Sequence, residues 1–412
     1  MKKRILPLIT TLLCVAILFA ACGSAANNTP NPSETNNPSS NEASPTGTEK
    51  KDTIKIGNMQ DLSGSTSESG TANTWGAEYM VRLINEAGGI NGCEVELITL
   101  DTKNDTQQAI NCFNMFVDEY DVDVIIGPPV SNIAVAIAPL CQEVEIPMVG
   151  HYVDPRATTD EVTGKAWDYM FLIAPLAAQH GETMADYAIK RLGAKTAACL
   201  YDEGNSFAYT TALPFLEYAE ANGLSVVAAE KFQSTDADYR AQAGKIVAAN
   251  PDVVYLPNYA KQNVLAYDQL RQAGYKGIIL GATTCQFPFT DLISTELHDL
   301  HFLQVADMGN PDTDLYKVEE IFMKETNTKY QKVNVAYGYD SVCVIADALA
   351  RCKDVHDGAE LASMIETCKD VKTLSGVVTM DPNTHVVDNA PLYITVYDEN
   401  KEYKVVEEYY LK

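Results

Sequence analysis

Residues that could hold a small polar ligand gather in six short segments of this 412-residue chain, each after an expected strand. The segments are rich in Ser, Thr, Asn and Tyr, and they are Gln60–Gly70, Gly127–Asn132, Gly150–Pro155, Asp202–Phe207, Pro257–Lys261 and Gly281–Phe287. In open α/β sheets, ligands bind beyond the carboxyl ends of the strands, where loops lead into helix N-termini. Hydroxyl, amide and backbone N–H groups there suit hydrogen bonding to a small molecule. The alternative for any one segment is an ordinary solvated loop.

Side chains suited to catalysis are present but form no known constellation. The sequence has no Gly-x-Ser-x-Gly elbow, no Gly-x-x-x-x-Gly-Lys-Ser/Thr phosphate loop and no His-Glu-x-x-His pair. The six histidines are scattered, and His298 and His301 fall in a loop-like stretch. We therefore expect a protein that is not an enzyme and that needs no cofactor.

The ten cysteines include no Cys-x-x-Cys pair and have no histidine cluster beside them, so we expect no metal site. Eight of them follow Cys22, and several sit in apolar patterns, where cysteine is a small buried side chain. If the chain is exported, disulfides are permitted. Cys343 and Cys368 are then the best-placed pair, on two successive helices. A reducing habitat would leave all eight thiols free.

The N-terminus has the pattern of an export signal. Basic residues precede an apolar run from Ile5 to Phe19, and Ala20-Ala21-Cys22-Gly23 follows. The small pair before Cys22 resembles the lipobox of bacterial lipoproteins, with Phe19 where Leu is usual. The resemblance implies removal of residues 1–21 and a diacylglycerol on the Cys22 thiol. The alternatives are a plain signal peptide or a membrane helix, although the run is short for a span of ~20 residues.

Residues 23–51 are almost entirely Asn, Ser, Thr, Pro, Ala and Gly, without an aromatic residue. Such a segment cannot bury enough apolar surface to offset the entropy of ordering. Residues 22–52 are therefore predicted to be a disordered tether with an end-to-end distance of about 30 Å. The folded part would begin near Thr53, at the outer face of the cell membrane, and no later apolar run approaches a membrane span.

Size and charge narrow the class of protein further. The folded part exceeds the ~250–300 residues at which single cores stop growing, so two domains are expected. The formal net charge is −26. This acidity argues against nucleic acid as a partner, because nucleic acid requires basic patches.

Strand and helix patterns alternate along the folded part. The first series has strands at 53–59, 93–100, 122–127 and 146–150 and helices at 71–87, 106–119 and 131–143. A second series has helices at 179–192, 207–222, 238–249 and 261–273 and strands at 196–201, 224–230, 252–256 and 277–281. Helices at 333–351 and 358–367 and a strand-like tail at 379–411 follow. The pattern predicts an α/β protein of two doubly wound parallel-sheet lobes.

Four stretches resemble the branched-chain amino-acid (leucine/isoleucine/valine-type) substrate-binding proteins of ABC transporters. They are residues 56–66 (IGNMQDLSGST), 84–92 (INEAGGING), 124–127 (VIIG) with Ser131, and 337–340 (YGYD). The resemblance covers about residues 53–411, and the stretch at 84–92 is the most specific. It implies the type I periplasmic-binding fold, in which three crossovers join two lobes that close around a ligand by a hinge motion.

By this resemblance the chain would cross between lobes near Ala174, Asp307 and Val378. The N-terminal lobe would be residues 53–174 plus 307–377, and the C-terminal lobe residues 175–306 plus 378–412. The implied partners are a small-molecule ligand and the permease subunits of an ABC importer, and the implied state is a monomer. The alternative is a surface receptor of the same fold that reports to a signalling partner.

The resemblance also carries binding roles onto the first lobe. Ser69 falls in the first specificity loop, and Ser131, with Asn132 beside it, falls on the serine that binds the ligand carboxylate. Tyr152 and Asp154 replace the small residue and the threonine that hold the main-chain groups of the ligand.

In the second lobe, ligand-facing tyrosines fall on Ser206 or Phe207 and on Tyr259, and the acid that accepts from an α-ammonium falls on Thr283. A buried unpaired charge is expensive, and Thr283 cannot balance an ammonium. Asp154 would do so from the other lobe, or would accept from the hydroxyls of a different ligand. The aromatic residues would form a wall for a sugar-like, amide, aromatic or cationic ligand, or belong to the core. The expected ligand is thus a small polar organic molecule.

Overall fold

The computed structural model describes residues 53–329, 332–388 and 390–411. The expected signal peptide, Cys22 and nearly all of the tether lie outside these residues. The described residues belong to one compact unit that contains two seven-stranded sheets. Within the described residues, no helix is both long and apolar enough to span a membrane.

The first sheet has the strand order β13-β14-β5-β4-β3-β1-β2. Its strands are β1 (Ile54–Gln60), β2 (Val95–Asp101), β3 (Val124–Ile126), β4 (Met148–Gly150), β5 (Met170–Leu172), β13 (Met380–Asp381) and β14 (Val386–Val387). Neighbours pair in parallel, except in the β13–β14 hairpin. The three residues of β3 are all buried apolar side chains, which is typical of a parallel strand covered on both faces.

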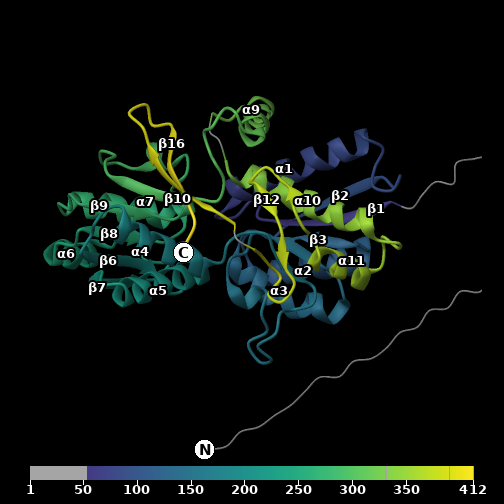
Figure 1. Cartoon of the computed structure of the whole chain (residues 1–412), viewed down its shortest axis with the longest axis horizontal. Coiled ribbons are helices and arrows are strands. Elements are labelled where there is room, and N and C mark those ends of the chain that lie inside the picture. Colours follow the sequence, from purple (N-terminus) through teal and green to yellow (C-terminus); the bar gives the residue numbers. More distant parts are fainter. Residues whose placement is uncertain (1–52, 330–331, 389, 412) are drawn as a thin grey trace, which may run out of the picture. The chain divides into compact units, whose positions relative to one another are not determined.

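Six helices accompany this sheet and form with it what we call the first lobe. They are α1 (Ser67–Glu86), α2 (Thr106–Met115), α3 (Ser131–Val144), α9 (Asp314–Thr326), α10 (Asn334–Arg351) and α11 (Gly358–Glu366). Although α10 is far from α1 in sequence, the two helices pack together, and α10 also contacts β3 and β4 (Figure 1). On the other side, α2 packs against α3.

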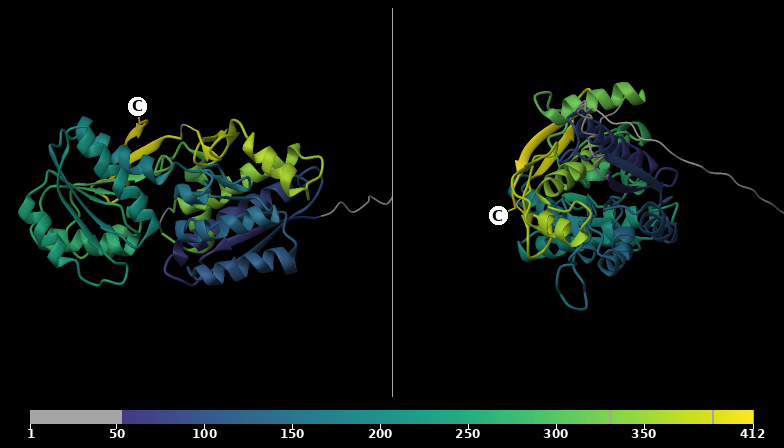
Figure 2. Two further views of the ribbon diagram at one scale, coloured as in Figure 1. Left: turned by 90° about the horizontal axis from the view of Figure 1, so that it is seen from below. Right: turned by 90° about the vertical axis from the view of Figure 1, so that its right-hand side faces the viewer.

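The second sheet has the order β16-β15-β10-β9-β8-β6-β7, and with its helices it forms the second lobe. Its strands are β6 (Thr196–Asp202), β7 (Ser225–Phe232), β8 (Val253–Leu256), β9 (Ile278–Gly281), β10 (Leu300–Gln304), β15 (Leu392–Tyr397) and β16 (Tyr403–Tyr409). Its helices are α4 (Ala177–Lys190), α5 (Ser206–Ala221), α6 (Arg240–Ala249), α7 (Ala260–Gln272) and α8 (Phe289–Leu292). Figure 2 shows the C-terminal strands beside this teal lobe, where β15 pairs antiparallel with β10.

The predicted α/β class with two mainly parallel lobes is confirmed. The elements not predicted from the sequence include β5, β10, α8 and α9. The interpretation of His301 as a loop residue is wrong, because it lies within β10. The last crossover does not lie near Val378, because β13 and β14 still belong to the first sheet. The chain passes to the second sheet between Val387 and Leu392. A small ladder of β11 (Val371–Lys372) and β12 (Val377–Val378) precedes this passage.

The contact between α1 and α10 depends on glycine. A Cβ atom at Gly338 would lie 1.9 Å from the carbonyl oxygen of Asn73, and one at Gly76 would lie 2.0 Å from that of Val335. Backbone atoms cannot yield as the end of a flexible side chain can, so the two helices approach this closely only without side chains here. This explains Gly338 in the Tyr-Gly-Tyr-Asp stretch.

We expect Gly338→Ala to destabilise the protein by about 1–3 kcal/mol, because overpacking forces the two helices apart. Gly244→Ala in α6 is the matched control, since a Cβ there meets nothing within 4 Å. That control should be neutral or stabilising by about 0.5–1 kcal/mol, since alanine favours a helix interior. Urea denaturation of both variants measures the difference, and equal stabilities would contradict the packing argument.

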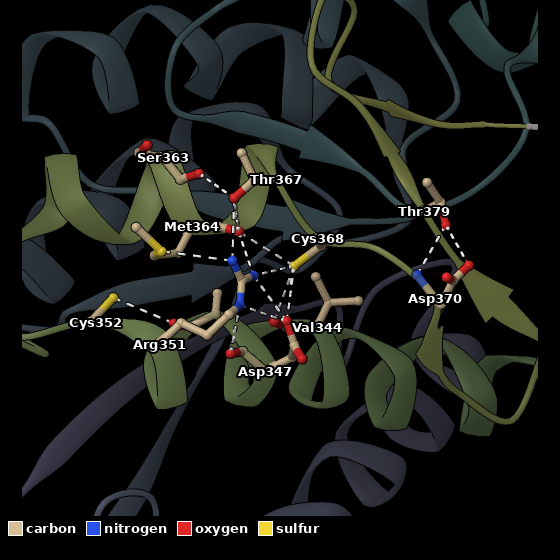
Figure 3. Close-up of polar contacts among 11 residues, drawn as sticks. Val344, Asp347, Arg351, Cys352, Ser363, Met364, Thr367, Cys368, Asp370 and Thr379 are labelled. Atoms are coloured by element: carbon tan, nitrogen blue, oxygen red, sulfur yellow. Dashed lines mark hydrogen bonds and ion pairs between the residues drawn. The ribbon is translucent and has the colours of Figure 1, made fainter.

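Cys343 and Cys368, the best-placed pair if disulfides formed, are not bridged, and the eight cysteines of the described residues carry free, buried thiols. Cys368 lies instead beside Arg351, whose Nη2 atom is 3.1 Å from its sulfur (Figure 3). The same guanidinium bonds the carboxylate of Asp347 and the carbonyl of Met364, and so joins α10 to α11. The surroundings of the Cys368 thiol are therefore polar groups of these two helices.

Candidate ligand-binding cavity

A cavity of about 570 Å³ is bordered by loops of both lobes. Its size lies in the usual range of small-molecule sites. Its first-lobe wall comes from the segment before α1, the first turn of α1, the start of α3, the segment after β4 and the start of α10. Its second-lobe wall comes from α4, α5, α7 and the segment after β9. Most of these segments follow carboxyl ends of strands, where open α/β sheets bind ligands.

Five of the predicted site residues line this cavity: Ser69, Ser131, Phe207, Tyr259 and Thr283. A second cavity of about 570 Å³ lies beside α8, α9 and the turn between β15 and β16. Phe287 borders both cavities, but the second contains none of the predicted residues. The first cavity is therefore the candidate functional site.

On the first-lobe wall, Ser131 is the first residue of α3. The amides of Ile133 and Ala134 both bond the carbonyl of Val130, so the amides of Ser131 and Asn132 have no acceptor within the helix. Free amides and the helix dipole favour a negative group at this end. The site can therefore bind a carboxylate or another hydrogen-bond acceptor of a ligand.

On the second-lobe wall, Phe207 and Tyr259 stack with ring centroids 5.5 Å apart and an interplanar angle of 7°. Phe207 lies in the first turn of α5, and Tyr259 directly precedes α7. Burial raises the pKa of Tyr259 to about 12, so its hydroxyl stays protonated at neutral pH. The pair offers a flat apolar surface to a ligand, which supports the predicted aromatic wall in part.

Four other predicted residues do not line the cavity, and Tyr152 is the clearest of them. It is fully buried, and its hydroxyl lies within hydrogen-bonding distance of two carbonyl oxygens, those of Met148 and Phe171. The residues on either side of it, His151 and Val153, do line the cavity. Successive side chains of extended backbone point to opposite sides, so the placement of Tyr152 in the core turns its neighbours toward the cavity.

The remaining three residues, Asn132, Asp154 and Ser206, contact one another across the two lobes. The carboxylate of Asp154 accepts from the hydroxyl of Ser206, and Arg156 donates to both residues. The side-chain oxygen of Asn132 accepts from the amide of Ser206. Burial opposes ionisation of Asp154, but the bonds from Arg156 and Ser206 outweigh it and lower its pKa. Asp154 is thus an ionised carboxylate already paired within the protein, and it is not available to a ligand ammonium.

His151 and His180 also line the cavity, although the sequence did not single them out as site residues. His151 stacks on Tyr337 with ring centroids 4.1 Å apart, and His180 lies one turn into α4. Burial lowers the pKa of His151 to about 3. Burial also lowers the pKa of His180 to about 4, although the nearby carbonyl of Pro175 opposes this shift. Both rings are therefore neutral at pH 7.

The two carboxylates that line the cavity already have partners within the protein. Asp61 accepts from the amides of Gly64 and Thr66 and from the Thr66 hydroxyl, at 2.5–2.7 Å, and so holds the loop before α1. Glu68 pairs with Lys332 at 3.0 Å. These are the only carboxylates among the described lining residues. The residues that the structure describes also contain no cluster of three or more His, Cys, Asp or Glu side chains that could hold a metal ion.

Two lobes of mainly parallel sheet, with a cavity bordered by both, define the two-lobed class of small-molecule binding proteins. The chain belongs to the periplasmic binding protein family, whose sequence profile matches residues 53–402. It is therefore a binding protein and not an enzyme.

Several known proteins are similar to this chain. It is 25% identical over 327 residues to Leu/Ile/Val-binding protein homolog 3 of Brucella melitensis, with 79% of this chain and 86% of that protein aligned. The crystal structure of a leucine-binding protein of Thermotoga maritima has a TM-score of 0.76 at 25% identity and covers 86% of this chain and 98% of its own. A branched-chain amino-acid binding protein of Streptococcus pneumoniae, solved with isoleucine, has a TM-score of 0.75 at 24% identity, with 87% and 99% covered.

Proposed function

We propose that this protein is the extracytoplasmic solute-binding lipoprotein of an ABC importer and captures a small polar organic molecule between its lobes. The observation that carries the proposal is the cavity of about 570 Å³, which is bordered by ligand loops of both lobes. A ligand that contacts both walls stabilises the closed arrangement, since it binds that arrangement with more contacts than an open one.

Each wall would have its own part in capture. The start of α3, with the hydroxyl of Ser131 and the free amides of Ser131 and Asn132, would hold an acidic or carbonyl group of the ligand. Phe207 and Tyr259 would cover an apolar part from the second lobe, and Ser69 and Thr283 would add hydroxyl contacts. The similarity to Leu/Ile/Val-binding proteins supports amino acids or related compounds as the class to test first.

The lipid anchor is the second part of the proposal. Cys22 would carry the lipid, and the tether of residues 22–52 would keep the folded part near the permease subunits while leaving it free to sample solvent. The support for this part is the sequence pattern around Cys22.

A thermal-shift screen tests ligand capture directly. The panel should contain amino acids, amides, sugars, nucleosides, aromatic acids and quaternary amines. A ligand at 100 times its dissociation constant should stabilise the protein by ~2.7 kcal/mol. Stabilisation by one compound class supports the proposal, and no stabilisation across the panel contradicts it.

Ser131→Ala tests the proposed role of the α3 terminus. We expect affinity for the ligand to fall about 5- to 30-fold, which corresponds to a lost hydrogen bond of about 1–2 kcal/mol. Ser363→Ala is the control, because Ser363 is exposed on α11 and does not line the cavity. Isothermal titration calorimetry of both variants gives the comparison, and full affinity in Ser131→Ala would exclude this serine from the site.

A further inference from the structure

The two histidines of the cavity have unsatisfied hydrogen-bonding groups. His151 and His180 are 6% and 2% exposed. Among the described residues, Nδ1 of His151 has no hydrogen-bond partner, and neither ring nitrogen of His180 makes a well-formed hydrogen bond, although the carbonyl of Pro175 lies near that ring. A buried polar group without a partner destabilises a folded protein, so its presence on a cavity wall indicates that something else satisfies it. Because both rings line the cavity, a bound ligand can do so.

The protonation state of the pair sets which ligand groups it can bind. With pKa values lowered by burial to about 3 for His151 and about 4 for His180, both imidazoles are neutral at pH 7. A neutral imidazole offers one N–H donor and one acceptor nitrogen. The pair therefore suits a group that both donates and accepts, such as a hydroxyl, an amide or a heterocyclic ring edge, and it offers no positive charge.

Aromatic stacks on both walls add a requirement of shape. His151 and Tyr337 present one stacked pair from the first lobe, at an interplanar angle of 15°. Phe207 and Tyr259 present another from the second lobe. Aromatic faces and edges bind other aromatic rings favourably, beyond the area that they bury. Two such pairs in a cavity of about 570 Å³ favour a planar ring over a branched aliphatic chain.

An α-ammonium group, by contrast, finds no carboxylate in this cavity that is without a partner already. Thr283 is neutral, Asp61 is held by its own loop, and Glu68 is paired with Lys332. The buried carboxylate of Asp154 is bonded to Arg156 and Ser206 outside the lining. Burying an unpaired ammonium is costly, so a ligand with this group is disfavoured relative to one without it.

We propose that the cavity takes an aromatic or heteroaromatic carboxylic acid that lacks an ammonium group, and that His151 and His180 hydrogen-bond the polar edge of its ring. The proposal rests on the proposed function, since the acidic group would occupy the α3 terminus at Ser131. The ring would lie against the stacked aromatic pairs. The two histidines, one from each lobe, then hydrogen-bond the ligand from both walls of the cavity and favour ligands with a polar ring edge.

Matched pairs of compounds separate the ammonium from the ring. Titration calorimetry should compare 3-(4-hydroxyphenyl)propanoate with tyrosine, indole-3-propanoate with tryptophan, and 3-(imidazol-4-yl)propanoate with histidine. In each pair the two compounds differ only by the α-ammonium. We expect at least one ring acid to bind, and to bind at least tenfold more tightly than its amino-acid counterpart.

Three other outcomes would overturn the inference. Tighter binding of the amino-acid counterparts would do so, as would binding of leucine, isoleucine or valine, or of a sugar, without any ring acid. In these cases the protein would still capture a ligand, so the proposed function would stand. If no compound of the wider screen bound, the proposed function would fail together with the inference.

His151→Phe and His180→Phe test the ring nitrogens while keeping a flat ring. Each should lower affinity for the bound ring acid about tenfold. Neither should reduce the thermal stability of the ligand-free protein, because each replaces an unsatisfied imidazole with an apolar ring. His298→Phe outside the cavity is the control and should leave affinity unchanged. Undiminished affinity in both cavity variants, or loss of ligand-free stability that parallels loss of affinity, would contradict the proposal.

Discussion

Replacing Ser206 with alanine is expected to weaken ligand binding about tenfold, although Ser206 does not line the cavity. Its hydroxyl donates to the ionised carboxylate of Asp154 and accepts from Arg156, both in the first lobe. These contacts exist only while the lobes are together. A hydrogen bond to a charged group contributes about 1.5–3 kcal/mol, and the lower figure corresponds to a tenfold change in the population of the closed state.

The variant can be interpreted because the rest of this contact survives. Asp154 keeps its bonds from the guanidinium and amide of Arg156, so no buried carboxylate is left without a partner. The N-cap of α5 is Asn205, which bonds the amide of Ala208, and so α5 should still form. The expected effect is therefore on the equilibrium between open and closed lobes.

Ser234→Ala is the matched control for this prediction. The hydroxyl of Ser234 donates to Asp202, also a carboxylate, but both residues lie in the second lobe. The control should lower thermal stability modestly and leave affinity unchanged. Calorimetric dissociation constants for both variants, with ligand-free melting temperatures alongside, give the comparison. An equal loss of affinity in the two variants would show that the Ser206 contact has no special role in closure.

Much of the fold followed from the sequence, because long elements carry a strong pattern. The helix predicted at 333–351 is α10, and the strand predicted at 196–201 is nearly all of β6. The missed strand β5 has only three residues, too few to show a period. The order of β13 and β14 was also beyond the sequence, because short strands join a sheet through pairing partners distant in the chain, here β5.

The cavity was harder to predict than the fold, and the segment after β4 shows why. The resemblance placed Tyr152 and Asp154 in the ligand site. Tyr152 instead fits the core, because its hydroxyl lies beside two carbonyls of neighbouring strands. This placement determines the direction of the side chains on either side of it. A shift of one residue exchanges the two sides of extended backbone, which leaves His151 and Val153 at the cavity.

His180 was harder to predict as a cavity residue than His151. The only indication in the sequence is its place near the start of the helix after the first crossover, and many surface histidines have such a place. It lines the cavity together with residues that are distant in the sequence, such as Ser131 and Tyr259. Long-range packing of this kind is not encoded in local spacing. The partner of Cys368 was likewise not predictable from local spacing, since its thiol contacts Arg351 and forms no bridge to Cys343.

The second large effect is expected at Glu319, where glutamine should stabilise the protein at alkaline pH. Glu319 lies in α9 and is fully buried, and neither carboxylate oxygen makes a well-formed hydrogen bond among the described residues. Burial raises the pKa of Glu319 to about 8, although the nearby amide of Lys332 opposes this shift. Glu319 is therefore protonated in the folded protein at neutral pH.

The sign of the pH dependence follows from the proton count. An unfolded glutamate has a pKa of about 4.3, so between that pH and about 8 the folded state binds the extra proton. The contribution of protonated Glu319 to the free energy of unfolding is therefore fully present below pH ~4.3. It falls as the pH rises to about 8, by at most about 1.4 kcal/mol per pH unit. A glutamine side chain cannot ionise, so Glu319→Gln should remove this loss and be more stable than the parent protein by about 2–4 kcal/mol at pH 9.

Urea denaturation at pH 5, 7 and 9 measures the effect, with Glu320→Gln as the matched control. Glu320 is the neighbouring residue of the same helix and is exposed, so its ionisation changes little on folding. The stability advantage of Glu319→Gln should grow with pH, while Glu320→Gln should follow the parent protein at all three values. A constant difference between Glu319→Gln and the parent would mean that Glu319 does not change its protonation on unfolding. In that case Glu319 would be ionised in the folded protein as well, and another group would have to stabilise its buried carboxylate.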